Sequence, residues 1–172
     1  MEVIREAKKS DLDAMIDLWA ETIDWQPVNP ISVRDEYMPK ASDVVHLAEA
    51  WKGSIDLRTV MVSYKNQELM GFCVASPYVQ NNGVPDRLMI HDVYVSPWIP
   101  ENDLTEKLLI QMGKKAQKEG YRRMSIGISS TREDNLKEQC IRLGAMYTGI
   151  QGLNFSYIEN YEWRDLSLFE NR

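Results

Sequence analysis

The stretch "VYVSPWIPENDLTEKLL", residues 93–109, constrains the fold more than any other part of the chain. It begins as an apolar strand, breaks at Pro97 and continues as an amphipathic helix. Backbone N–H groups without intrahelical partners collect at such a helix start, where they often bind an anionic group. Here the helix start carries Glu101, Asp103 and Glu106. Their negative charges interact favourably with the helix dipole and would repel a phosphate. The sequence therefore poses the question of whether this helix start still binds an anion.

The rest of the chain changes period between helix-like and strand-like segments, without an internal repeat or a linker. Two helical faces come first: one runs from Leu12 to Ile23, and the other ends at Gly53. Two strands joined by a short turn follow, and further helices are predicted after residue 100 and over residues 132–143. Strands are predicted at residues 2–6, 58–64, 68–79, 87–96, 122–129, 145–150 and 153–158. This order predicts a mixed sheet with helices packed on it.

Length, composition and charge exclude several classes of protein. A chain of 172 residues with 44% apolar residues is expected to form one domain with its own core. No apolar run approaches the roughly 20 residues of a membrane span, and there is no signal-peptide pattern, so we expect a soluble, cytoplasmic protein. The net charge of −6 argues against nucleic-acid and membrane partners and leans slightly towards a cationic acceptor, with a small amine, a peptide N-terminus and a protein lysine all compatible. Cys73 and Cys140 have no metal-ligand spacing, so we predict free thiols and no metal site.

Three motifs in this order resemble the GNAT superfamily of acyl-CoA-dependent N-acyltransferases. They are "DVYVSP" at residues 92–97, "MSIGIS" at residues 124–129 and "RLGAMYTG" at residues 142–149, with a predicted helix in each interval. The resemblance covers residues 1–158, which implies a single GNAT-like domain followed by a C-terminal tail at residues 159–172.

The resemblance implies a particular α/β (α+β) architecture. The sheet is expected to be mixed, mostly antiparallel and twisted, with about seven strands and about four helices packed on both faces. The strands at residues 87–96 and 122–129 are expected to splay apart, because GNAT proteins bind acyl-CoA in such an opening.

The helix start departs from the family at the positions that bind the cofactor. In GNAT proteins a loop written Q/R-x-x-G-x-G/A holds the CoA pyrophosphate with its backbone amides. Pro100 stands here in place of the Arg or Gln, and Asp103 and Thr105 stand in place of the two glycines, with Leu104 between them. Glycine admits the closest approach of a phosphate to the backbone, which these side chains remove. Asp103 and Glu106 instead resemble a capping box that satisfies the helix start without a ligand.

The preceding strand keeps the other half of the family's cofactor site. By resemblance, the backbone of Val93, Tyr94 and Val95 would pair with the pantetheine arm and polarise the thioester carbonyl of acetyl-CoA or a related acyl-CoA. This contact uses backbone groups, so it does not depend on side-chain identity.

Three residues occupy positions where the family places catalytic groups. His91 stands where many GNAT enzymes have a glutamate base, and histidine titrates near neutral pH, although a hydrogen-bonded residue of the sheet is the alternative. Asp92 is its neighbour, and successive strand residues point to opposite faces, so the two are expected to face different ways. Cys140 replaces the tyrosine that protonates the leaving thiolate and is otherwise a core residue, while Tyr147 is a substitute donor or a packing residue.

Two functions from different classes stay open. The first is transfer of an acetyl group from acetyl-CoA to an amine acceptor. The second is a GNAT-fold protein without catalysis that acts as an interaction or structural module in a larger assembly. The apolar C-terminal tail, with Trp163 and Phe169, either docks on the domain or binds a protein partner, and a homo-oligomer is compatible with both functions.

Overall fold

The computed structural model describes residues 1–25, 41–99, 103–130, 132, 135–153 and 156–172. Within them, seven strands form one twisted sheet in the order β1-β2-β3-β4-β5-β7-β6. Neighbouring strands are antiparallel except for β4 and β5, which are parallel, so the predicted mixed and mostly antiparallel sheet is confirmed. The strands are β1 Glu2–Glu6, β2 Val60–Lys65, β3 Glu68–Val79, β4 Pro85–Val95, β5 Arg123–Ser129, β6 Met146–Leu153 and β7 Ser156–Trp163.

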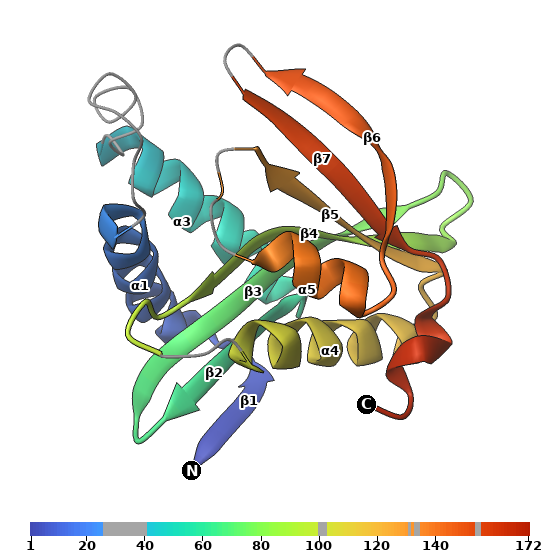
Figure 1. Ribbon diagram of the computed structural model, residues 1–172. Coiled ribbons are helices and arrows are strands. Elements are labelled where there is room, and N and C mark those ends of the chain that lie inside the picture. Colours follow the sequence, from blue (N-terminus) through green and yellow to red (C-terminus); the bar gives the residue numbers. More distant parts are fainter. Residues whose placement is uncertain (26–40, 100–102, 131, 133–134, 154–155) are drawn as a thin grey trace.

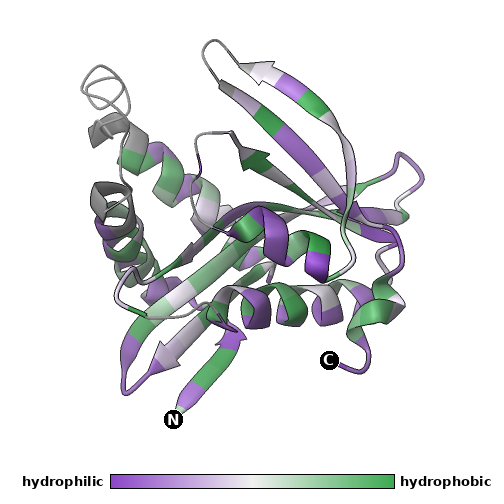
Figure 2. Ribbon diagram, in the orientation of Figure 1, coloured by the Kyte–Doolittle hydropathy of each residue, from purple (hydrophilic) through white to green (hydrophobic). Residues whose placement is uncertain are grey.

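Helices cover both faces of this sheet, as predicted (Figure 1). Helices α1 (Leu12–Trp25) and α3 (Ala41–Asp56) pack on β2, β3 and β4 from one side. Helices α4 (Asp103–Lys118) and α5 (Leu136–Arg142) pack on the other side, over a larger core. Figure 2 shows hydrophobic and hydrophilic residues succeeding one another along α4, as expected of a helix with one buried face. Helix α3 runs three residues beyond the end predicted at Gly53.

A β-bulge interrupts β4 at His91. Val74 of β3 pairs with Asp92, and the next residue, Ala75, pairs with Ile90, which leaves His91 as the extra residue. Leu88, Ile90 and Val93 all face the core beneath α4, so the alternation of sides shifts by one residue between Ile90 and Val93.

The shift places His91 and Asp92 on the same side of the sheet, facing away from α4. The sequence prediction that these neighbours face opposite sides is therefore wrong. It assumed the regular period of two, which a bulge breaks because two residues of one strand oppose a single residue of the other.

The bulge coincides with the end of pairing between β4 and β5. The two strands pair over Arg87–Ile90 and Arg123–Ile126. Beyond this point β4 stays paired with β3 as far as Val95, and β5 stays paired with β7 as far as Ser129. The two strands are splayed, as predicted, and the opening lies between residues 91–95 of β4 and the end of β5.

The C-terminal residues belong to the domain. Strand β7 extends to Trp163, so the boundary predicted after residue 158 falls inside a strand. A short 3₁₀ helix, Leu166–Phe169, then packs against α4 (Figure 1). The side chains of Trp163 and Phe169 are fully buried. Of the two alternatives for the tail, docking on the domain is the one observed. In the part of the chain that the structure describes, no helix is both long and apolar enough to cross a membrane.

The contact between Phe169 and Gly113 can be tested by paired substitutions. A Cβ atom at Gly113 would lie 2.5 Å from the Phe169 ring, so α4 needs a glycine there while the ring is present. We expect Phe169→Ala to lower the free energy of unfolding by about 3–5 kcal/mol, and Gly113→Ala to be destabilising as well. In the Phe169→Ala background the same Gly113→Ala change should stabilise by about 1 kcal/mol, because alanine is the better helix former.

Urea denaturation of the four proteins in this cycle measures the coupling between the two positions. Leu168→Ala, at a half-exposed neighbour of Phe169, is the matched control and should cost much less. Strictly additive effects at positions 113 and 169 would contradict the proposed contact.

Candidate active site

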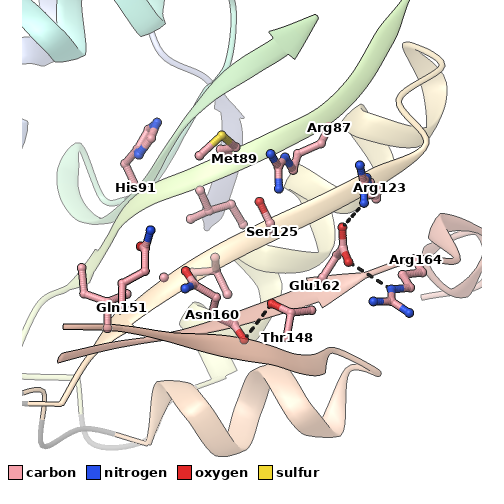
Figure 3. A pocket seen from close by; sticks show the side chains of 14 residues that line it. Arg87, Met89, His91, Arg123, Ser125, Thr148, Gln151, Asn160, Glu162 and Arg164 are labelled. Atoms are coloured by element: carbon pink, nitrogen blue, oxygen red, sulfur yellow. Dashed lines mark hydrogen bonds and ion pairs between the residues drawn. The ribbon is translucent and has the colours of Figure 1, made fainter. Parts of the chain in front are cut away.

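A cavity of about 610 Å³ lies on the sheet face opposite α4, over β4, β5, β7 and β6 (Figure 3). Most of its lining residues alternate along these strands, because the intervening side chains face the core beneath α4; Ile90 and Ile126 of that core also reach the cavity. His91 lies at one end, and arginines gather at the other end (Figure 3). Met89, two residues before His91 on β4, lies between them. Side chains of Ser125, Thr148 and Asn160 supply neutral polar groups between the two ends, and Gln151 lies at the same end as His91.

His91 is exposed at the edge of this cavity. Its Nε2 atom lies 2.5 Å from the hydroxyl oxygen of Ser76, on the neighbouring strand β3, and shares a short hydrogen bond with it. This bond fixes one ring nitrogen, and the ring stays accessible from the cavity. The geometry combines both sequence interpretations of His91, because a sheet residue with a hydrogen-bond partner also faces a cleft.

Asp92, on the same side of the sheet, is partly buried and packs towards α3. The indole Nε1 of Trp51 on α3 donates a hydrogen bond of 2.9 Å to its carboxylate. Burial raises the pKa of the Asp92 carboxyl, and the bond from Trp51 and the nearby His91 and Arg132 only partly offset this effect. A buried carboxyl with a raised pKa beside a cleft is a common feature of functional sites.

The far end of the cavity is an arginine-rich cluster. Glu162 is buried and forms ion pairs with both Arg123 (2.9 Å) and Arg164 (3.0 Å). Arg123 also donates a bond of 2.9 Å to the buried carboxylate of Asp86. The guanidinium of Arg87 lies over the Tyr78 ring, at 5.2 Å from its centre, and its Nε is buried without a hydrogen-bond partner. Locally the cavity is therefore basic, which is the opposite of what the net charge suggested.

The opening between β4 and β5 contains the guanidinium of Arg132. It donates a hydrogen bond of 2.6 Å to the carbonyl oxygen of Val93 and lies 5.5 Å from the centre of the Tyr94 ring. The contact shows that the Val93 carbonyl faces the opening, where β5 no longer pairs with β4. A ligand that pairs with this carbonyl would either share it with Arg132 or displace the guanidinium.

Residues 103–105 begin α4, at the position predicted to hold a pyrophosphate. Leu104 and Thr105 are buried, and Leu104 belongs to the core beneath α4. The Asp103 carboxylate is exposed and lies 3.6 Å from the ammonium group of Lys107, one turn later. Asp103 is the first residue of the helix, and the position before it, like Pro100, lies outside the described residues, so the predicted capping box stays a prediction.

Cys140 and Tyr147 are not brought together with His91. Cys140 is fully buried in the core beneath α5, close enough to Cys73 to contribute to the raised pKa of that thiol. Tyr147 is half-exposed on β6, and its ring packs edge-on against Tyr161, a residue of the same core. Both therefore lie on the α5 side of the sheet, whereas His91 faces the cavity on the other side.

Sequence reasoning did not predict that Arg87, Arg123 and Glu162 would line a cavity. The available signal was the alternation along "RLMIH" and "RMSIG", whose polar members share one face. Among the described residues no group of His, Cys, Asp and Glu side chains has the arrangement of a metal site.

Comparisons with known proteins identify the fold. No protein-family model matches the sequence, and a search of curated proteins finds no significant match. Many solved structures share the fold, including N-acetyltransferases and a GNAT-family acetyltransferase from Bacillus cereus.

Three of these similar structures are particularly informative. The polyamine N-acetyltransferase of Drosophila melanogaster matches with a TM-score of 0.73 and 12% identity, over 95% of this chain and 100% of that one. The yncA protein of Salmonella typhimurium, solved with its cofactor acetyl-CoA, has a TM-score of 0.72 and 21% identity, over 95% and 94%. The paiA N-acetyltransferase of Thermoplasma acidophilum, in complex with coenzyme A, has a TM-score of 0.70 and 13% identity, over 95% and 99%. The chain thus has the GNAT fold, as predicted from its sequence.

The buried Asp92 carboxyl predicts a pH-dependent stability. Because its pKa is raised, the folded protein binds this proton more tightly than the unfolded chain does. The free energy of unfolding should therefore fall as pH rises from the usual aspartate range through the raised pKa. We expect Asp92→Asn, which keeps a hydrogen-bond acceptor for Trp51, to be more stable than the native protein at about pH 7, with the difference shrinking towards about pH 4.

Urea denaturation at the two pH values measures this difference. Asp17→Asn, at an exposed position of α1, is the matched control and should show no such trend. A native protein that is the more stable one at about pH 7 would mean that the Asp92 carboxylate is stabilised by its surroundings, contrary to the argument from burial.

Proposed function

We propose that this protein is an N-acyltransferase that transfers an acetyl group from acetyl-CoA to an amine. The observation that carries the proposal is the opening between β4 and β5, which exposes backbone groups of β4 at the end of a cavity that contains His91. GNAT-fold structures solved with acetyl-CoA or coenzyme A show that the fold accommodates this cofactor.

Backbone groups of Val93, Tyr94 and Val95 would hold the pantetheine arm in the manner of an added strand. Strand pairing inside a sheet is broken here, so an amide-containing ligand can use donors and acceptors that β5 leaves unpaired. The amides of Asp103, Leu104 and Thr105 at the start of α4 would face the pyrophosphate. Leu104 and Thr105 are buried as whole residues in the free protein, so binding of a pyrophosphate here would have to expose their amides.

His91 would act as the general base. The amine nitrogen attacks the thioester carbonyl carbon, the C–S bond breaks, and the CoA thiolate leaves. The nitrogen loses a proton in the process, and His91 is the titratable side chain at the accessible end of the cavity. Ser76 holds the ring through Nε2, and the buried Asp92 carboxyl lies on the same face. Cys140 and Tyr147 would reach the thiolate only from the α5 side of the opening.

A second candidate function is that of a GNAT-fold interaction module without catalysis. The observation that favours it is that the protein's own residues use the groups expected to bind the cofactor. Arg132 donates a hydrogen bond to the Val93 carbonyl, and Asp103 and Glu106 place negative charge at the start of α4. Both features oppose the binding of a diphosphate-containing ligand at those groups.

Titration of the protein with acetyl-CoA separates the two candidates. We expect calorimetry to detect binding in the micromolar range, because the strand edge supplies several backbone contacts to the pantetheine arm. Coenzyme A, titrated in parallel, shows how much of the affinity comes from the acetyl group. Absence of heat at millimolar acetyl-CoA would overturn the proposed transferase and favour the interaction module.

Substitution of His91 tests its role in catalysis. We expect His91→Ala to lower kcat/KM for the amine by about 10²–10⁴, the usual contribution of a general base, with little change in acetyl-CoA affinity. His46→Ala is the matched control, because His46 is the only other histidine and is exposed on α3. Equal losses of acetyl-CoA affinity and turnover in His91→Ala would instead identify a structural histidine.

A further inference from the structure

The arginine-rich end of the cavity has no role in the transfer chemistry described above. It lies on β4, β5 and β7, away from His91 (Figure 3). Arg87 and His91 are four residues apart on one strand, which separates their Cα atoms by about 13 Å at the usual rise per residue. The cavity is therefore an elongated site with different chemistry at each end.

The charges at this end do not balance. Two buried carboxylates, Asp86 and Glu162, are both engaged by Arg123, and Glu162 also pairs with Arg164. Arg87 is the third arginine at this end of the cavity. In the described part of the chain no ion pair between Arg87 and a carboxylate is observed. Its contact with Tyr78 holds the group in place, and its buried Nε has an unmet hydrogen-bond donor. A partly buried guanidinium in this state strongly favours an anionic ligand, because burial of an unpaired charge and donor costs free energy.

We propose that the acceptor is an amine with an anionic group, a carboxylate or a phosphate, at its far end, and that Arg87 binds this group. The proposal rests on the proposed acetyl transfer, since the amine end of the ligand is assigned to His91. The planar guanidinium can donate two parallel hydrogen bonds to either anion. Met89, between the two ends, provides an apolar surface for the linking atoms.

This assignment predicts which acceptors are too short or wrongly charged. A free α-amino acid holds its amine and carboxylate only a few bonds apart, so it cannot reach both His91 and Arg87. A polyamine would place a second cation beside Arg87 and would be repelled. The Drosophila protein with the same fold is a polyamine N-acetyltransferase, so the fold does not itself exclude such substrates. In this chain the discrimination comes from Arg87.

The test compares matched ligands that differ only in the anionic group. Triglycine is compared with triglycine amide, and glucosamine 6-phosphate with glucosamine; spermidine represents the cationic class. Binding of each is measured by calorimetry on the full chain without cofactor, so that the result does not depend on acetyl transfer. Release of the CoA thiol, with acetyl-CoA present, is then measured for the same five compounds.

We expect at least one anionic ligand to bind about 10–100 times more tightly than its neutral partner, as a charged hydrogen-bonded contact provides. Arg87→Met should remove this preference and leave the affinity for the neutral partner unchanged, and Arg87→Lys should keep part of it. Arg122→Met is the matched control, since Arg122 is exposed and does not line the cavity, and it should behave like the native protein.

Three results would overturn the proposal: tighter binding of spermidine, equal binding of charged and neutral partners, or no binding of either anionic ligand at millimolar concentration. Equal effects of Arg87→Met and Arg122→Met would overturn it as well. The carboxylate and phosphate pairs distinguish the two sources of the anion. Failure of the transferase itself appears separately, as absence of acetyl-CoA binding with the anion preference intact.

Discussion

The bulge at His91 is the constraint on which the candidate site depends. One extra residue in β4 shifts the alternation of sides, so that His91 and Asp92 face the same side of the sheet while Val93 still reaches the core beneath α4. The pairing of β4 with β5 ends immediately before this residue. The same local irregularity therefore accompanies both parts of the site, the accessible side chains on one face and the unpaired backbone at the opening.

The sequence predicted the architecture well, because the architecture follows from periodicity and from motifs that resemble a known family. Strand and helix order, the mixed sheet, helices on both faces and the splayed strands were all predicted. The register error at His91 and Asp92 has a different origin. A bulge is a property of two paired strands, in which Val74 and Ala75 oppose Asp92 and Ile90, and the sequence of β4 alone contains no sign of the extra residue. The end of the domain was misjudged for a similar reason, since β7 continues to Trp163 by pairing with β5.

Arg132 already makes a contact inside the opening. Arg132 donates to the Val93 carbonyl, and such a bond to a charged donor contributes about 1.5–3 kcal/mol at most. A pantetheine arm that pairs along β4 would replace this one bond with several, and the displaced guanidinium would remain near the cofactor. The carboxylates at the start of α4 differ from Arg132, because a ligand cannot displace them from the helix start. They would repel the phosphates whatever the position of Arg132. Of the two obstacles, the second therefore limits affinity more.

The charge of the cavity shows why a whole-chain property is a poor guide to a site. The chain has a net charge of −6, which would favour a cationic ligand at long range, yet solvent screens such interactions within about 10 Å. Inside the cavity the relevant charges are the few that are held at short range by buried partners. The two carboxylates of Glu162 and Asp86 balance the charges of Arg123 and Arg164. Arg87 then adds one positive charge that has an aromatic contact but no carboxylate in the described structure. The three arginines differ in whether they have a carboxylate partner. This difference, and not the number of arginines, assigns a ligand-binding role to Arg87.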